Sequence, residues 1–149
     1  MIDSTFPNIY KAINTAKAVL SELGLDDPAE YKNTDIASIL RLFIREVNQI
    51  GAEARLVFNK NVGIISIKSD ISPESRKRFT IAHEIGHYHL HYGQQPAFVC
   101  TPEMIYECYK GNQCETEANA FAAEFLMPEM IFKKECYNEN ICKELLSNL

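Results

Sequence analysis

Apolar residues recur every three or four positions in two segments of the amino-terminal third of the chain. In residues 9–23 this spacing is that of an amphipathic helix, and Gly24 follows as a stop signal. Residues 35–50 repeat the spacing, with Thr34 as a candidate N-cap and Gly51 after the last apolar position. The pattern therefore predicts two helices, over residues 9–23 and 35–50.

The pattern then changes to short runs rich in β-branched and aromatic residues. Residues 54–58 read ARLVF and residues 62–68 read VGIISIK, and the turn-prone tripeptide NKN separates them. Such runs favour strands, and their close spacing favours a direct connection. We expect an antiparallel hairpin over these two segments.

Helical spacing returns in the second half of the chain. Ser72 is a candidate N-cap with Pro73 at the first helical position, and the helix is expected to continue to about His91. A further helix is predicted over residues 115–127, where Pro128 ends it. These two helices carry the residues whose chemistry is discussed below.

The remaining segments have weaker patterns. Residues 94–112 contain two prolines and a glycine and are expected to be irregular, and the tail from about residue 128 suggests one or two short helices that break near Asn138. The order is helices, a small sheet and then helices, which predicts an α+β fold. At this length we expect one domain over residues 1–149.

Charge and hydropathy narrow the functional classes. Fifteen lysine and arginine residues stand against twenty aspartate and glutamate residues, a net charge of −5. This balance argues against direct binding to nucleic acid through a broad phosphate-binding surface. No apolar run has the roughly 18 residues that a membrane span needs, and the amino terminus lacks the pattern of a secretory signal. We therefore expect no membrane association and a cytoplasmic location.

The five cysteines are odd in number and form no C-x-x-C pair. In a cytoplasmic chain they are expected to be reduced, partly buried thiols. A redox or metal-binding role for the group Cys100, Cys108 and Cys114 is the alternative.

All four histidines lie between residues 83 and 91, and two of them form an H-E-x-x-H motif. His83 and His87 are four positions apart, so they project side by side from one helix face. Two neutral imidazoles at this spacing can bind one Zn²⁺, and Glu84 is placed to take a proton from a water molecule as general base. Gly86 in mid-helix costs about 1 kcal/mol relative to alanine, which predicts a close approach of a neighbouring backbone or of a substrate.

Two residues are candidates for a third metal ligand. His91 lies about 12 Å from His83 along a straight helix axis, so it is expected to contact a ligand or a substrate, or simply to pack. Glu115 has Asn119 one turn later on the same helix face, where an amide can orient a ligand. We favour Glu115 as the third ligand, with a surface carboxylate as the alternative, while Glu117 points to another side.

Two segments carry a resemblance to a known family. RFTIAHEIGHYHLH (78–91), followed by ETEANAFAAEFLMP (115–128), resembles the ImmA/IrrE family of metallo-endopeptidases. The resemblance implies a small zincin-like domain with amino-terminal helices, a short antiparallel sheet, an HExxH helix and a second ligand-bearing helix. It also implies a gluzincin-like site with the following residues: His83, His87 and Glu115 as metal ligands and Glu84 as catalytic base.

The resemblance further implies a biological role. Such proteins, from bacteria or phages, cleave a helix-turn-helix repressor and release the genes that it silences, in mobile-element induction or stress responses. This chain has no room for its own helix-turn-helix domain, so the repressor is expected to be a separate polypeptide encoded nearby. The expected metal is Zn²⁺, with Mn²⁺ as the alternative. Candidates to stabilise the transition state are His91, Tyr88, Tyr106 and Tyr109.

Two other functions are compatible with these residues. The protein could be a regulatory binding module that contains zinc and acts on a partner without proteolysis, or a redox sensor that uses its central cysteines. Three protein ligands leave one coordination position open, which favours catalysis over the binding module.

Overall fold

A computed structural model describes residues 6–27, 30–48, 51–106 and 111–138 of the chain. In these residues six helices and four strands follow one another as α1 (Ile9–Glu22), α2 (Asn33–Ile39), β1 (Leu42–Val47), β2 (Ala54–Asn59), β3 (Val62–Lys68), α3 (Glu74–Leu90), β4 (Ala97–Cys100), α4 (Pro102–Tyr106), α5 (Gln113–Leu126) and α6 (Glu129–Asn138). None of the described helices is both long and apolar enough to cross a membrane.

The four strands form one sheet with the order β1-β3-β2-β4. Strand β2 is antiparallel to both β3 and β4, whereas β1 is parallel to β3. The α+β fold and the hairpin of β2 and β3 are therefore confirmed. The sheet is mixed rather than antiparallel throughout, because the chain crosses over from β1 to β3 by way of β2.

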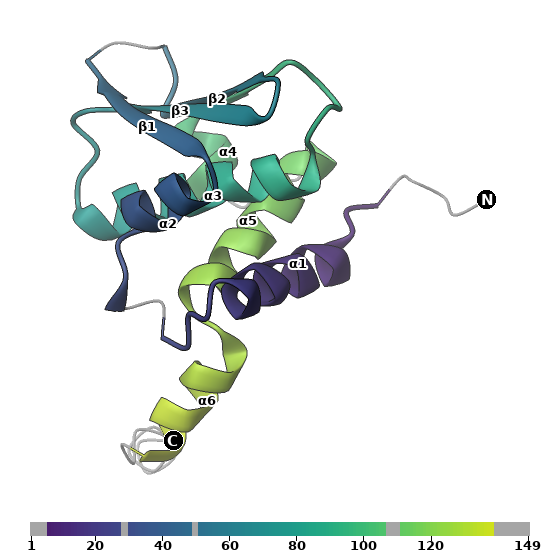
Figure 1. Ribbon diagram of the computed structural model, residues 1–149, viewed down its shortest axis with the longest axis vertical. Coiled ribbons are helices and arrows are strands. Elements are labelled where there is room, and N and C mark those ends of the chain that lie inside the picture. Colours follow the sequence, from purple (N-terminus) through teal and green to yellow (C-terminus); the bar gives the residue numbers. More distant parts are fainter. Residues whose placement is uncertain (1–5, 28–29, 49–50, 107–110, 139–149) are drawn as a thin grey trace.

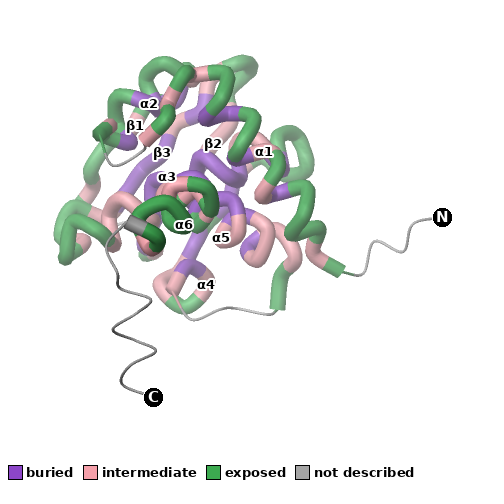
Figure 2. The backbone as a smooth tube through the Cα atoms, turned by 90° about the horizontal axis from the view of Figure 1, so that it is seen from below, coloured by how far each residue is buried: buried purple, intermediate pink, exposed green. Residues whose placement is uncertain are grey.

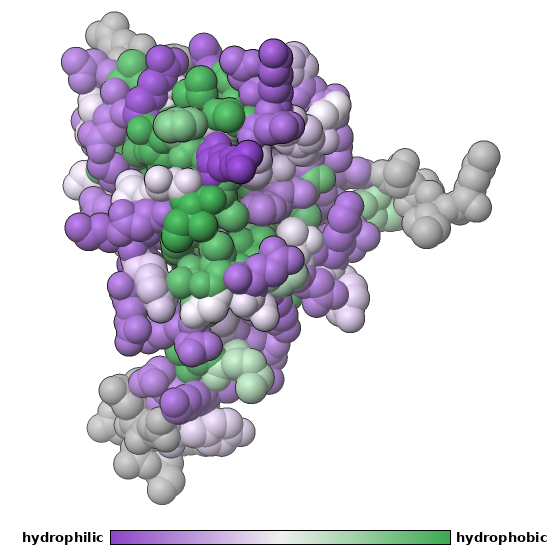
Figure 3. All heavy atoms as spheres, viewed as in Figure 1, coloured by the Kyte–Doolittle hydropathy of each residue, from purple (hydrophilic) through white to green (hydrophobic). Residues whose placement is uncertain are grey.

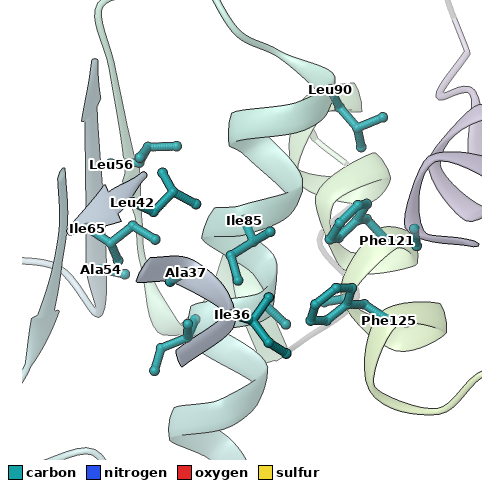
Figure 4. Close-up of a cluster of buried hydrophobic side chains, with 14 of the residues drawn as sticks. Ile36, Ala37, Leu42, Ala54, Leu56, Ile65, Ile85, Leu90, Phe121 and Phe125 are labelled. Carbon is teal, nitrogen blue, oxygen red and sulfur yellow. The ribbon is translucent and has the colours of Figure 1, made fainter. Parts of the chain in front are cut away.

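Helix α3 lies between the sheet and the pair of helices α5 and α1 (Figure 1). In Figure 4, Ile85 of α3 has Leu42 and Ile65 of the sheet on one side and Phe121 and Phe125 of α5 on the other. All of these side chains are buried, and burial of each contributes about 1.5–3 kcal/mol. The buried backbone in Figure 2 accordingly runs through α3 and the middle strands, while α6 lies on the exposed outside.

The predicted helix over residues 35–50 is wrong in its second half. Helix α2 ends at Ile39, Arg41 has a positive φ of 61°, and the chain continues as strand β1. The apolar spacing in this segment fits a strand as well, since Leu42 is buried and Ile44 is partly buried on alternate positions. Pairing with β3 satisfies the backbone of β1, so tertiary contacts override the helical pattern.

The expectation of an irregular segment over residues 94–112 is also wrong. It contains β4 and α4, and β4 pairs with residues 54–57 of β2. The four residues of β4 lie between Pro96 and Pro102, which are loop signals, and their pairing partner is distant in sequence. Local pattern alone therefore could not identify this strand.

The helices at both ends of the chain and the two motif-bearing helices occur near the predicted places. Helix α3 begins at Glu74 with Pro73 as its N-cap, one residue later than expected, and Ser72 does not cap it. Helix α6 accounts for the first part of the tail, and residues 139–149 lie outside the described residues.

Helices α3 and α5 approach most closely at Gly86. A Cβ atom added there would lie 3.1 Å from Phe121 Cδ1 and 3.2 Å from the Ala118 carbonyl oxygen. The prediction that a neighbouring backbone approaches this glycine is confirmed. This contact fixes the spacing of the two helices that carry both sequence motifs.

We predict that Gly86→Val destabilises the protein, although valine is the better helix former. The added side chain has no space against the α5 backbone, and such overpacking costs about 1–3 kcal/mol. Urea denaturation followed by circular dichroism measures the change in the free energy of unfolding. Ser75→Val, at an exposed position of the same helix, is the control and should change it by less than about 0.5 kcal/mol. Equal stability of both variants would show that the two helices are not held in close contact.

Candidate metal centre

Three elements bring four potential metal-binding side chains together in the protein interior. Helix α3 supplies His83 and His87, β4 supplies Cys100, and α5 supplies Glu115. All four are buried, and their donor atoms all lie within 4.8 Å of one another. The predicted residues His83, His87 and Glu115 are thus neighbours in space although 32 positions separate the first from the last.

The donor atoms of three of these residues face a common point. The Nε2 atoms of His83 and His87 are 3.0 Å apart. The two carboxylate oxygens of Glu115 lie 3.1 Å from His83 Nε2 and 3.4 Å from His87 Nε2. Two ligand atoms bound to one tetrahedral zinc ion, each about 2.0–2.2 Å from it, would be separated by about 3.3–3.5 Å. The observed spacing is close to that arrangement.

Asn119 holds the first imidazole. His83 Nδ1–H donates a hydrogen bond of 2.8 Å to Asn119 Oδ1, and Asn119 Nδ2 donates to the Met104 carbonyl at 2.9 Å. Since Nδ1 carries the proton, the Nε2 lone pair of His83 points into the cluster. Asn119 therefore selects the tautomer that can bind a metal ion.

A longer chain of hydrogen bonds holds the second imidazole. His87 Nδ1–H donates to His91 Nδ1 at 2.9 Å, and His91 Nε2–H donates to Glu117 Oε2 at 2.8 Å. Glu117 Oε1 in turn accepts a bond of 2.6 Å from the backbone N–H of Asn8, the N-cap of α1. His91 thus contacts His87 and not the cluster centre, and Glu117 has a partner that the sequence did not reveal.

The charge states of the buried groups suit a cation. Burial lowers the pKa of His87 to about 3, so this imidazole is neutral at physiological pH. Burial alone would raise the pKa of Glu115, but the adjacent imidazoles of His83 and His87 outweigh burial and hold that pKa below its usual range. Two lone pairs and an anionic carboxylate therefore converge, and only a positive charge between them relieves their repulsion.

Glu84 is the clearest sign that the cluster fits a metal ion with a further small ligand. Its side chain is fully buried, and neither oxygen has a hydrogen-bond partner among the described residues. Burial raises its pKa to about 7, although the nearby His83 opposes this shift. An unpartnered buried carboxyl costs about 1–3 kcal/mol, which a water molecule beside the cluster would offset.

Cys100 is the fourth member of the cluster, and the sequence analysis offered it only as part of an alternative redox or metal-binding group with Cys108 and Cys114. Its Sγ atom lies 3.5 Å from His87 Nε2 and 4.0 Å from Glu115 Oε1. Phe98, two positions earlier, is also buried and stacks on His87 with ring centroids 4.2 Å apart. Phe98 and Cys100 lie on the same buried face of β4, but all four residues of AFVC are apolar, so the sequence alone does not show which face is buried.

Tyr88 and Tyr106 do not join the cluster. Tyr88 packs against Phe58 and Tyr92, with ring centroids 6.1 and 5.9 Å away. Tyr106 donates a hydrogen bond of 3.1 Å to Glu53 and lies under the guanidinium of Arg76. Tyr109 lies outside the described residues.

The fold and the buried cluster are together those of a small zincin-like metallopeptidase domain. The chain matches the model of the M78 peptidase family, described as the IrrE N-terminal-like domain, over residues 40–147. The match includes all four residues of the cluster, and the chain belongs to this family. The resemblance to ImmA/IrrE proteins is thereby confirmed. No curated protein matches the chain.

We predict that Asn119→Ala and His91→Ala each weaken metal binding about 10–100-fold, because each removes the partner that orients one imidazole. Titration with Zn²⁺ against a competing chelator measures the affinity. His89→Ala is the control, since the His89 ring stacks on Phe121 and is not part of the cluster. Unchanged affinity in the first two variants would mean that these hydrogen bonds do not organise the ligands.

Proposed function

We propose that this protein is a zinc-dependent endopeptidase that cleaves a separate helix-turn-helix transcriptional repressor. The observation that carries the catalytic part is the position of Glu84, a buried carboxyl without a partner beside three converging donor atoms. Membership of the M78 family supports proteolysis as the reaction.

His83, His87 and Glu115 would hold the metal ion, and zinc suits this set better than manganese. Imidazole nitrogen together with a nearby thiol is a donor set typical of Zn²⁺, whereas Mn²⁺ favours carboxylate and water oxygens. When bound, such an ion acts as a Lewis acid that polarises a peptide carbonyl and makes an adjacent water molecule more acidic.

Glu84 supplies the proton transfer. A carboxyl with a pKa near 7 is matched to accepting a proton from water and then donating it to the leaving amine. Because Glu84 is buried, bulk water does not compete for its oxygens. The carboxylate is therefore available to a water molecule or substrate bound at the cluster. Asn119 and His91 keep the two imidazoles in place during this exchange.

The position of β4 suits an extended polypeptide as substrate. Strand β4 is at the end of the sheet, with β2 on one side and no further strand among the described residues on the other. It ends at Cys100, within the cluster, and Val99 is exposed. A segment of the substrate that pairs with this free edge would pass the end of β4, where Cys100 belongs to the cluster.

Surface properties support a protein partner. Apolar side chains gather down the middle of the face shown in Figure 3, with polar side chains on either side. The net charge of −5 favours a basic partner, and a repressor that binds DNA carries positive charge. In line with the resemblance to ImmA/IrrE proteins, we propose that the gene for such a repressor lies nearby, and that both proteins act in the cytoplasm of a bacterium that carries a phage or mobile element.

A regulatory binding module with a structural metal ion is the second candidate. The observation in its favour is Cys100, which offers a fourth protein ligand, as in closed structural sites. A structural site, however, has no use for a buried carboxyl without a partner such as Glu84. We therefore prefer the peptidase.

Incubation with the co-encoded repressor tests the proposal. We predict that the wild-type protein yields a fragment that disappears when a chelator is added. Glu84→Gln should retain one metal ion per chain and lose cleavage by at least about 100-fold, because it removes the general base. His83→Ala should lose both metal and cleavage, and Glu124→Gln, a matched change on α5, should retain both.

Two results would contradict the proposal. Full cleavage by Glu84→Gln would remove this residue from its role. Binding of the repressor without any fragment, by both the metal-replete wild-type protein and Cys100→Ser, which lacks the fourth potential protein ligand, would favour the binding module.

A further inference from the structure

We infer that the Cys100 thiolate is a fourth protein ligand of the metal ion and that it keeps the peptidase latent until the sulfur is displaced. The latency rests on the proposed peptidase function, whereas the ligation does not. The inference comes from three features of the structure: the distances around Sγ, the fixed position of Cys100 on β4, and the neighbouring Glu84.

The distances fit coordination by sulfur. A zinc ion about 2.3 Å from a thiolate and about 2.0–2.1 Å from an imidazole, in tetrahedral geometry, places sulfur and nitrogen about 3.6 Å apart. Cys100 Sγ is 3.5 Å from His87 Nε2. Its distance of 4.0 Å from Glu115 Oε1 is close to the same arrangement, and a small movement of the carboxylate would complete it.

The backbone holds Cys100 in this position. Its carbonyl accepts a hydrogen bond of 2.9 Å from Glu53 N–H, and Cys100 is the partner of Ala54 in the ladder between β2 and β4. The side chain has no exposed surface. The thiol is therefore held beside the cluster and is not exposed at the surface while β4 stays in the sheet.

Glu84, which lies beside Cys100, provides a second indication that a ligand belongs here. Both of its oxygens are buried and unpartnered beside the cluster, so the site is built to receive a molecule that is distinct from the three predicted ligands. Water and the Cys100 thiolate would compete for the same fourth position. A thiolate on the metal has already lost its proton, whereas a water molecule in that position gives Glu84 a proton to accept.

When the Cys100 sulfur binds the metal ion, one bond breaks, one bond forms and one proton is released. The S–H bond of Cys100 breaks, a bond from sulfur to the metal forms, and one proton is released to solvent. Four protein ligands then close the site, as in structural zinc sites, and exclude the water that hydrolysis needs. Activation reverses this balance: sulfur leaves, the thiol regains a proton, and water takes the fourth position.

Substitution with Co²⁺ tests the ligation without any measurement of activity. The metal-free, reduced protein is loaded anaerobically with one equivalent of Co²⁺, and absorption is recorded in the near ultraviolet, where a thiolate bound to cobalt gives a charge-transfer band. We predict this band in the wild-type protein and in Cys114→Ser, whose Sγ lies 3.6 Å from Gln94 Oε1. Cys100→Ser should lose the band, keep the visible bands of bound cobalt, and bind Co²⁺ at least about tenfold more weakly.

X-ray absorption by the wild-type zinc protein gives a second measurement that needs no variant. One sulfur atom at about 2.3 Å from zinc is expected. A metal-replete wild-type protein with neither the cobalt band nor a sulfur neighbour would overturn the ligation and leave the peptidase proposal intact.

Cleavage of the co-encoded repressor tests the latency. Cys100→Ser should cleave at least about tenfold faster per bound zinc ion than the wild-type protein, since its fourth position is open to water. Equal rates together with a sulfur ligand would overturn the latency. No cleavage by either protein, with the charge-transfer band present, would contradict the peptidase proposal and leave the ligation in place.

Discussion

The close contact of helices α3 and α5 at Gly86 is the constraint on which the candidate site depends. Each helix carries only part of the donor set, two imidazoles on one and a carboxylate on the other. The carboxylate of Glu115 reaches both imidazoles because no side chain separates the helices at position 86. A glycine that weakens α3 as an isolated helix is therefore what allows the two motifs to form one centre.

Hydrogen bonds around the cluster determine which ring nitrogen of His83 and of His87 carries the proton. Asn119 accepts a hydrogen bond from His83 Nδ1–H, and His91 accepts one from His87 Nδ1–H. The Nε2 lone pairs of both imidazoles therefore point toward the cluster. The second of these chains continues through Glu117 to the backbone of Asn8. The amino-terminal helix, which lies outside the residues that match the family, is thereby connected to the imidazole of His87, a candidate metal ligand.

The sequence reveals this site better than it reveals the fold around it. His83 and His87 are four positions apart on a helix, so local periodicity is enough to place them side by side. Glu115 could be proposed because Asn119 follows one turn later, although only the folded chain shows that the two helices meet. Strand β1 was not predictable in the same way, since its apolar spacing fits a helix equally well and its pairing with β3 decides the outcome. Cys100 reaches the cluster through a four-residue strand whose partner is distant in sequence, so no local pattern points to it.

The central claim is that one metal ion is bound jointly by His83, His87 and Glu115. Anomalous diffraction at the zinc absorption edge, from crystals of the metal-replete protein, tests it most directly. The account predicts a single strong peak about 2.0–2.2 Å from the Nε2 atoms of both histidines and from a carboxylate oxygen of Glu115. A map without a peak there, or a peak with the Glu115 carboxylate turned away from it, would contradict the account.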